Sequence, residues 1–274
     1  MRLLILLRLK ALRQKSAVLQ LVVLLLIAPP AFAYRPFDST DASVAGRGEL
    51  ELECGPVGYL VDGEERFLIT PAAVLNVGVY EGWEIVVEGK NFVAVDSGPH
   101  QPHASFRDAA FSVKGVLRQG ALQDQAGPSV AVEVGLLLPE TGGGSSVGSS
   151  VAGIVSQRWK DMTVHVNGAF FWSRDHQAGQ FGGLIVEGPN RWRVRPVGEV
   201  TIEHEDGSGV AALGGLIWRL GGNLSFDAAW RFERSVDVTG RELRAGFTWA
   251  FPLTSSTGSN GATRTGRQGW RPRV

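Results

Sequence analysis

Residues 242–251 read Glu-Leu-Arg-Ala-Gly-Phe-Thr-Trp-Ala-Phe, so that apolar side chains alternate with polar or small ones. Successive side chains of a β-strand point to opposite faces, and this period of two predicts a strand with one apolar face. A strand of a soluble β-sandwich would show the same alternation. Here the pattern recurs along nearly the whole chain, with aromatic residues near the strand ends and no long helical stretch. Such repetition is the sequence signature of a transmembrane β-barrel.

The N-terminus has the features of a secretory signal peptide. Basic residues without any acid precede an apolar stretch at 17–27, and Ala31-Phe32-Ala33 places small residues where a signal peptidase cleaves. We therefore expect cleavage before Tyr34. The alternative is a transmembrane anchor, which is disfavoured because the unbroken apolar run is shorter than the ~20 residues that a membrane-spanning helix needs.

The charge of the chain is unevenly distributed. Lysine plus arginine and aspartate plus glutamate number 27 each, but residues 34–251 hold only 18 of the basic residues and all 27 acidic ones. This acidic body lacks the basic stripe that binds nucleic acid, so we expect no nucleic-acid partner. The single cysteine, Cys54, has no partner for an intramolecular disulfide and is interpreted as a small apolar side chain.

Alternation and turn residues together predict an all-β chain, a closed antiparallel up-and-down transmembrane barrel of about 12 strands. The expected organisation is a signal peptide at 1–33, a short N-terminal segment at 34–47, the barrel at 48–251 and a disordered basic tail at 252–274. The predicted strands cover residues 48–60, 66–78, 82–95, 105–118, 128–138, 147–157, 161–173, 179–187, 191–204, 209–220, 223–233 and 240–251.

The alternation also assigns the two faces of each strand. A lysine or arginine facing lipid at the bilayer midplane of a barrel costs about 2–4 kcal/mol, so the charged face must line the lumen. The apolar face, with Leu224, Phe226, Trp230, Phe247, Trp249 and Phe251 on the last two strands, is expected to contact outer-membrane lipid. The predicted lumen-lining residues are Glu49, Glu51, Glu53, Glu84, Glu88, Lys90, Lys114, Glu133, His165, Asn167, Arg191, Arg193, Arg195, Glu199, Glu203, Asp227, Arg231, Glu233, Glu242 and Arg244.

Five segments, at 46–53, 75–85, 108–117, 134–142 and 243–251, resemble outer-membrane proteins grouped as the phenol-degradation meta-pathway transporter-like family. The resemblance spans roughly residues 46–251, and the order of the segments carries it more than any single motif. It implies an outer-membrane barrel, with uptake of small hydrophobic or aromatic compounds associated with some members. The chain departs from the usual pattern of such barrels because a 23-residue tail follows Phe251, where an aromatic residue normally ends the protein.

The residues offer little support for catalysis or metal binding. The histidines are His100, His103, His165, His176 and His204, and His100 with His103 has a spacing that a metal site could use. The sequence gives that pair no evident cysteine or acidic partner, so we expect no metal site. The chain also lacks the Gly-x-Ser-x-Gly elbow of serine hydrolases. We expect no catalytic residues, no cofactor and no enzymatic activity.

Two rows of like charge bear on function. Glu49, Glu51 and Glu53 share one face of the first predicted strand, and Arg191, Arg193 and Arg195 share one face of the ninth. Either the rows belong to a salt-bridge network that fills the barrel, or they form a polar constriction that selects solutes. A twelve-stranded barrel is intermediate in size between an eight-stranded barrel, whose interior is filled by side chains, and a sixteen-stranded barrel, which leaves an open channel.

The sequence therefore predicts an outer-membrane β-barrel that serves as a narrow channel or transporter for small solutes, hydrophobic or aromatic ones among them. Assembly would depend on the barrel-assembly machinery of a Gram-negative-type envelope. Two alternatives remain open at this point. One is a structural outer-membrane barrel with a plugged lumen, and the other is a secreted soluble β-sandwich that binds a ligand.

Overall fold

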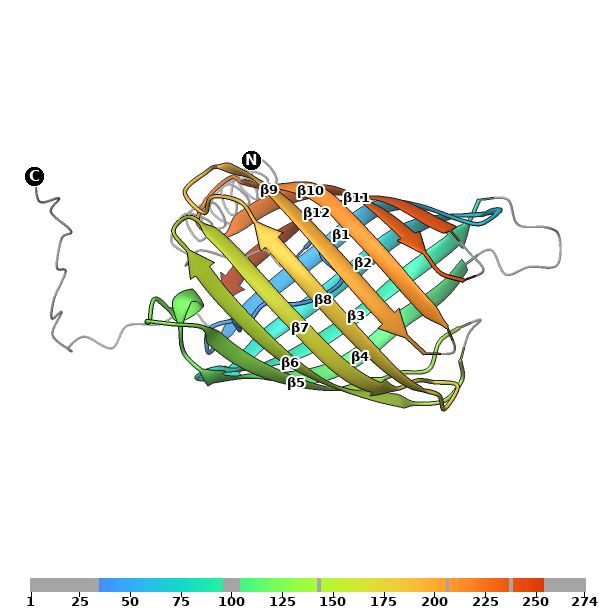
Figure 1. Ribbon diagram of the computed structural model, residues 1–274, viewed down its shortest axis with the longest axis horizontal. Helices are drawn as coiled ribbons and strands as arrows, with labels where there is room; N and C mark the ends of the chain where they lie inside the picture. Colours follow the sequence, from blue (N-terminus) through green and yellow to red (C-terminus); the bar gives the residue numbers. More distant parts are fainter. Residues whose placement is uncertain (1–34, 96–103, 142–143, 206, 237–238, 254–274) are drawn as a thin grey trace, which may run out of the picture.

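Twelve antiparallel strands form one closed barrel in the computed structural model (Figure 1). The structure describes residues 35–95, 104–141, 144–205, 207–236 and 239–253. The predicted signal peptide, most of the predicted tail, and His100 and His103 lie outside these ranges. The described part confirms the predicted fold class, a closed up-and-down barrel.

The strands and one short 3-10 helix follow one another along the chain as the alternation predicts. Eleven strands begin and end within two residues of the predicted limits, whereas β9 begins three residues late. The elements are β1 (Glu49–Asp62), β2 (Glu65–Tyr80), β3 (Trp83–Ala94), β4 (Ala104–Arg118), η1 (Ala121–Gln123), β5 (Ser129–Leu137), β6 (Gly148–Trp159), β7 (Met162–Trp172), β8 (Ala178–Glu187), β9 (Val194–His204), β10 (Ser208–Arg219), β11 (Leu224–Arg234) and β12 (Thr239–Pro252).

Each strand pairs with its neighbours in sequence, and β1 pairs with β12 to close the barrel. Closure leaves no strand edge with unpaired backbone groups, which is a requirement in a hydrocarbon environment. Cys54 lies at this seam, opposite Phe247 of β12 and Ala73 of β2. None of the helices among the described residues is long and apolar enough to cross a membrane.

The barrel has two different ends. The first, called the terminal end, is where β1 begins and β12 ends, on the left in Figure 1. The chain turns there between β2 and β3, between β6 and β7, and in the longer connection at 119–128 that holds η1. The opposite end holds the tight turn between β1 and β2 and the connection at 138–147.

The outer face carries an aliphatic band between two girdles of exposed aromatic residues. This arrangement is the one that transmembrane barrels present to the bilayer and its interfaces. The band includes Val87, Val113, Val134, Val155, Val166, Leu184, Val200 and Leu216. The girdle at the terminal end includes Tyr80, Trp83, Trp159, Trp192 and Trp218, and the girdle at the opposite end includes Tyr59, Phe106, Phe170, Trp172 and Phe232.

The chain before β1 runs inside the barrel, a placement that the sequence did not predict (Figure 1). We call residues 35–48 the N-terminal segment. Phe37 packs against a buried pair, Val197 of β9 and Ile217 of β10. Farther along, Ala42 joins a cluster of Ala131, Ile154 and Leu122. The segment is thus packed as a core element although it belongs to no sheet.

Candidate functional site

The lumen contains a cavity of about 1040 Å³ that is bounded by the wall and the N-terminal segment. Its lining reaches Glu81 and Gln123 at the terminal end, and Asp62 and Gly240 at the opposite end. The cavity therefore extends along the barrel axis and is not a pocket at one mouth. This elongated space is the candidate functional site.

Most of the predicted lumen-lining residues do face this cavity. Four others, His165, Arg195, Glu199 and Asp227, face inward but are buried beneath other groups. The cavity-lining members of the prediction are Glu49, Glu51, Glu53, Glu84, Glu88, Lys90, Lys114, Glu133, Asn167, Glu203, Arg231, Glu233, Glu242 and Arg244.

Two predicted lumen residues, Arg191 and Arg193, lie elsewhere and require a correction. Both are exposed in the connection between β8 and β9 at the rim of the barrel. The chain turns there because the Trp192 N–H donates to the Pro189 carbonyl, and β9 begins only at Val194. Arg191 pairs with Asp161 at 3.1 Å outside the lumen. The predicted row of three arginines is therefore wrong, and only Arg195 faces inward.

The predicted glutamate row on β1 is present. Glu49 accepts a hydrogen bond from the Gly46 N–H, at 3.1 Å, and Glu53 accepts one from the Asn76 amide at 3.0 Å. Glu51 lies between them and faces the cavity, with no hydrogen-bond or ion-pair partner among the described residues. One carboxylate of the row is thus free to interact with the contents of the lumen.

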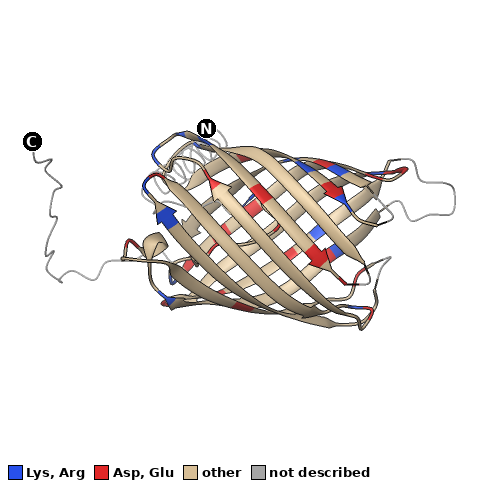
Figure 2. Ribbon diagram, in the orientation of Figure 1, with Lys and Arg blue, Asp and Glu red and all other residues tan. Residues whose placement is uncertain are grey.

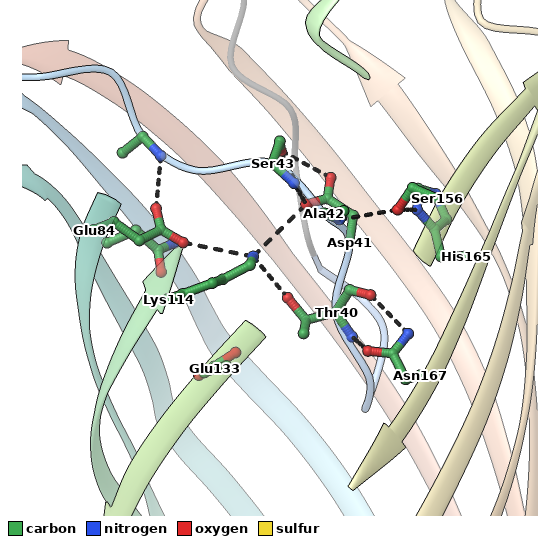
Figure 3. A network of polar contacts seen from close by, with 12 residues as sticks. Thr40, Asp41, Ala42, Ser43, Glu84, Lys114, Glu133, Ser156, His165 and Asn167 are labelled. Carbon is green, nitrogen blue, oxygen red and sulfur yellow. Dashed lines mark hydrogen bonds and ion pairs between the residues drawn. The ribbon is translucent and has the colours of Figure 1, made fainter. Parts of the chain in front are cut away.

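Lys114 links this acidic wall to the N-terminal segment (Figure 3). Its ammonium lies 3.5 Å from Glu84 Oε1 and 3.7 Å from Asp41 Oδ1, and it donates to Thr40 Oγ1 at 3.0 Å. Glu84 also accepts a hydrogen bond from the Ala45 N–H at 2.6 Å. Buried charges of opposite sign are thus paired, as burial of a charge requires.

The wall opposite Lys114 holds the same segment by neutral hydrogen bonds (Figure 3). Asn167 accepts from the Thr40 N–H at 3.1 Å and donates to the Thr40 carbonyl at 2.7 Å. The Ala42 N–H donates to Ser156 Oγ at 2.9 Å. Together these bonds tie Thr40 to β7 and Ala42 to β6.

Ser156 is also part of a buried polar row that the sequence analysis did not anticipate. Its hydroxyl lies 2.8 Å from His165 Nδ1, and His165 Nε2 lies 3.2 Å from Glu187. These residue types resemble a hydrolase triad. Ser156, however, is fully buried and covered by Ala42, so it has no space for a substrate. The row serves to hold the segment, and Arg195 completes it by pairing with Glu187 at 3.0 Å.

The strongest ionic anchor is Asp38 of the N-terminal segment. Its carboxylate accepts from Arg231 Nε at 2.5 Å and from Arg244 Nη1 at 2.8 Å. Burial acts to raise the pKa of Asp38, but the two guanidiniums outweigh burial and hold this pKa below its usual value. Each arginine has a second carboxylate of its own, Glu233 for Arg231 and Glu242 for Arg244.

Two further contacts fix the start of the segment. Glu199 accepts hydrogen bonds from the backbone N–H groups of Asp38 and Ser39, both at 2.8 Å. The Arg35 guanidinium lies 3.5 Å from the Asp227 carboxylate of β11. Predicted lumen residues of β9, β11 and β12 thus act mainly as partners of the segment, which explains why several of them are buried.

The remaining cavity is acidic. Among its lining residues, carboxylates outnumber lysines and arginines by more than two to one. Charged positions recur along the strands of the barrel (Figure 2). No group of three or more His, Cys, Asp or Glu in the described ranges is placed to hold a metal ion. The lumen therefore combines an enclosed space with an excess of carboxyl groups over basic side chains.

Comparison with a solved porin structure supports the fold. The KdgM porin, in a structure described as a complex with disordered oligogalacturonate, matches with a TM-score of 0.50 at 10% sequence identity, over 74% of this chain and 99% of that one. A protein described as the CymD monoaromatic hydrocarbon channel matches with a TM-score of 0.44 at 8% identity, over 76% and 89% of the two chains. No family model and no curated protein matches the sequence.

Proposed function

We propose that this protein is an outer-membrane channel for small water-soluble solutes and that it favours cations. The fold supports a membrane location because a closed barrel with an aliphatic band and two aromatic girdles suits a bilayer. The expected signal peptide agrees with export from the cytoplasm.

The single observation that carries the proposal is the acidic cavity that extends along the barrel axis. Carboxylates that line a narrow aqueous path attract cations and repel anions, and rings of such groups are a general means of selectivity in channels. Glu51 and Glu88 contribute most directly, because both face the cavity without an ion-pair partner among the described residues.

The proposed solute class differs from the one that the family resemblance implies. That resemblance suggests hydrophobic or aromatic compounds, which bind best to apolar surfaces. The buried apolar cluster of Phe67, Ile69, Ala72 and Phe92 occupies one stretch of the wall, and Arg107 stacks on both phenylalanine rings. The rest of the lining is rich in carboxylates, which favours hydrophilic solutes.

A second candidate function is a structural barrel whose lumen is occupied. The observation in its favour is the N-terminal segment, which pairs with many of the inward polar side chains. The two candidates differ in one measurable property, the passage of ions through the folded protein.

Planar-bilayer recordings of the purified protein test the proposal. We expect conductance and, under a salt gradient, a reversal potential of the sign for cation preference. The Glu51→Gln variant should reduce the cation preference, because it removes an ionisable carboxyl group that faces the cavity without a partner among the described residues. Glu64→Gln is the matched control, since Glu64 lies in the exposed turn between β1 and β2 and does not line the cavity. A folded protein without conductance would favour the structural barrel.

A further inference from the structure

We infer that the N-terminal segment, residues 35–48, is the specificity-determining element of this barrel, clamped across the lumen so that it limits the size of the solutes that pass. The inference rests on the proposed channel function. It adds which part of the chain sets the size limit for solutes. Four observations support it.

The segment reaches nearly all sides of the lumen. A peptide lying along one side would contact two or three adjacent strands. Here the polar contacts fall on β3, β4, β6, β7, β9, β11 and β12. The segment therefore crosses the interior and takes up part of its cross-section.

The barrel wall is shaped to admit the segment. A Cβ atom added at Gly246 would lie 2.4 Å from Arg35 Nε, and one at Gly183 would lie 2.6 Å from Ser39 Oγ. At Gly78, the added atom would lie 1.9 Å from the Gly46 carbonyl oxygen. Real side chains do not fit at such distances, so glycine at these three positions allows the close approach.

The segment is also anchored by opposite charges at successive points. Arg35 faces Asp227, Asp38 bridges Arg231 and Arg244, and Asp41 faces Lys114. Each of these three charges, one positive and two negative, has a wall partner of the opposite sign. A chain that merely occupied free space would need no such match.

The connection at 119–128 supports the segment from the terminal end. Gln123 of η1 donates to the Ala42 carbonyl at 2.9 Å, and Leu122 packs on the cluster that contains Ala42. This contact holds the segment inside the barrel near the terminal end, where the segment continues into β1.

The consequence for transport follows from barrel size. A twelve-stranded barrel encloses more room than eight strands, whose interior is filled by side chains. In this protein the N-terminal segment takes part of that room and leaves an acidic path beside it. Small cations and small amines fit such a path, whereas larger solutes require the segment to move.

Removal of the segment is the most direct test. The variant lacking residues 36–45 should show single-channel conductance about twofold higher or more, because a wider lumen carries more ions. In liposome-swelling assays it should also admit neutral sugars that the unmodified protein excludes. Heat-modifiable gel migration establishes that each barrel is folded before it is measured.

Point variants keep the test decisive if the deletion fails to fold. Arg35→Gln with Asp38→Asn removes two charged anchors, and it should raise the size limit and the current noise. The matched control is Arg191→Gln with Asp161→Asn, which removes an ion pair at the rim and should leave both unchanged.

The outcomes separate the two proposals. If the unmodified protein conducts and neither the deletion nor the anchor variant changes conductance or size limit, the inference is overturned and the channel function stands. If only the deletion variant conducts, the segment is an occluding element and the proposed open channel is overturned. If no folded form conducts, both proposals fail.

Discussion

Strand β12 contacts the N-terminal segment through Arg244, yet the two regions have different sequence patterns. In β12 the side chains alternate regularly, with Leu243 exposed outward and Arg244 buried inward. The segment has no such period, and it mixes buried apolar and charged residues, Phe37 packing next to the clamped Asp38. The wall is specified by local alternation, whereas the lumen is filled by contacts such as Asp38–Arg244, whose partners lie 206 positions apart.

The contact between the two regions should produce the largest effect on stability. Arg244→Met leaves Asp38 with one arginine and leaves Glu242 and the Pro36 carbonyl without their donor. Removing one partner of a buried ion pair costs about 3–5 kcal/mol. Asp38→Asn should cost much less, because both arginines keep their glutamates. Urea unfolding in lipid vesicles measures both, and a loss for Arg244→Met no larger than that of an exposed ion pair would show that the clamp does not couple wall and segment.

The wall alone is tested by neighbouring substitutions on β6. Val151→Arg places a charge on the lipid face and should cost about 2–4 kcal/mol. Ala152→Arg places the same charge in the cavity, where Ala152 pairs in register with Glu133. We expect a much smaller loss at Ala152 in the same unfolding assay. Similar losses at the two positions would contradict the assignment of the faces.

The fit of the segment to the wall is tested at inward glycines. Gly183→Val should destabilise the folded barrel by about 1–3 kcal/mol, the usual cost of overpacking, because its side chain would meet Ser39. Gly209→Val is the matched control, since Gly209 lines the cavity and a Cβ atom there would make only ordinary contacts, with Glu233 and Ser235. Resistance of residues 35–48 to protease should fall only in the Gly183 variant. Equal resistance in both variants would argue against close packing.

The smallest effect is expected at the rim. Arg191→Gln should change the unfolding free energy by no more than about 0.5 kcal/mol, because the Arg191–Asp161 pair is exposed to solvent. Arg195→Gln should cost more, since Arg195 is buried and paired with Glu187. If the two substitutions had the same effect, the corrected boundary of β9 would be in error.

The sequence predicted the strands of the wall well because the alternation of apolar and polar residues within each strand is visible without knowledge of the neighbouring strands. The ninth strand shows where this fails: Arg191, Arg193 and Arg195 alternate as in a strand, although the first two belong to a turn. Alternation alone does not distinguish these cases, because the start of β9 also depends on a distant contact, the hydrogen bond from the Arg219 N–H to the Arg193 carbonyl.

The lumen was predictable only in part. Alternation identified residues such as Glu84, Lys114 and Asn167 as inward-facing, but it did not reveal that they bind the N-terminal segment. The one available signal was the presence of glycines such as Gly78, Gly183 and Gly246 at inward positions. Without knowledge of which distant segment approaches them, these glycines indicate a close contact but not its partner.

Cross-linking the segment to the inside of the wall tests the central claim most directly. In a Cys54→Ser background, Ala42→Cys is combined either with Ser156→Cys, which faces the lumen, or with Val155→Cys, which faces outward on the same strand. Mild oxidation of the folded barrel should form a disulfide between residues 42 and 156 and not between residues 42 and 155, as read from gel mobility after unfolding. Absence of the 42–156 link, or equal linkage to residue 155, would contradict the placement of the N-terminal segment inside the barrel.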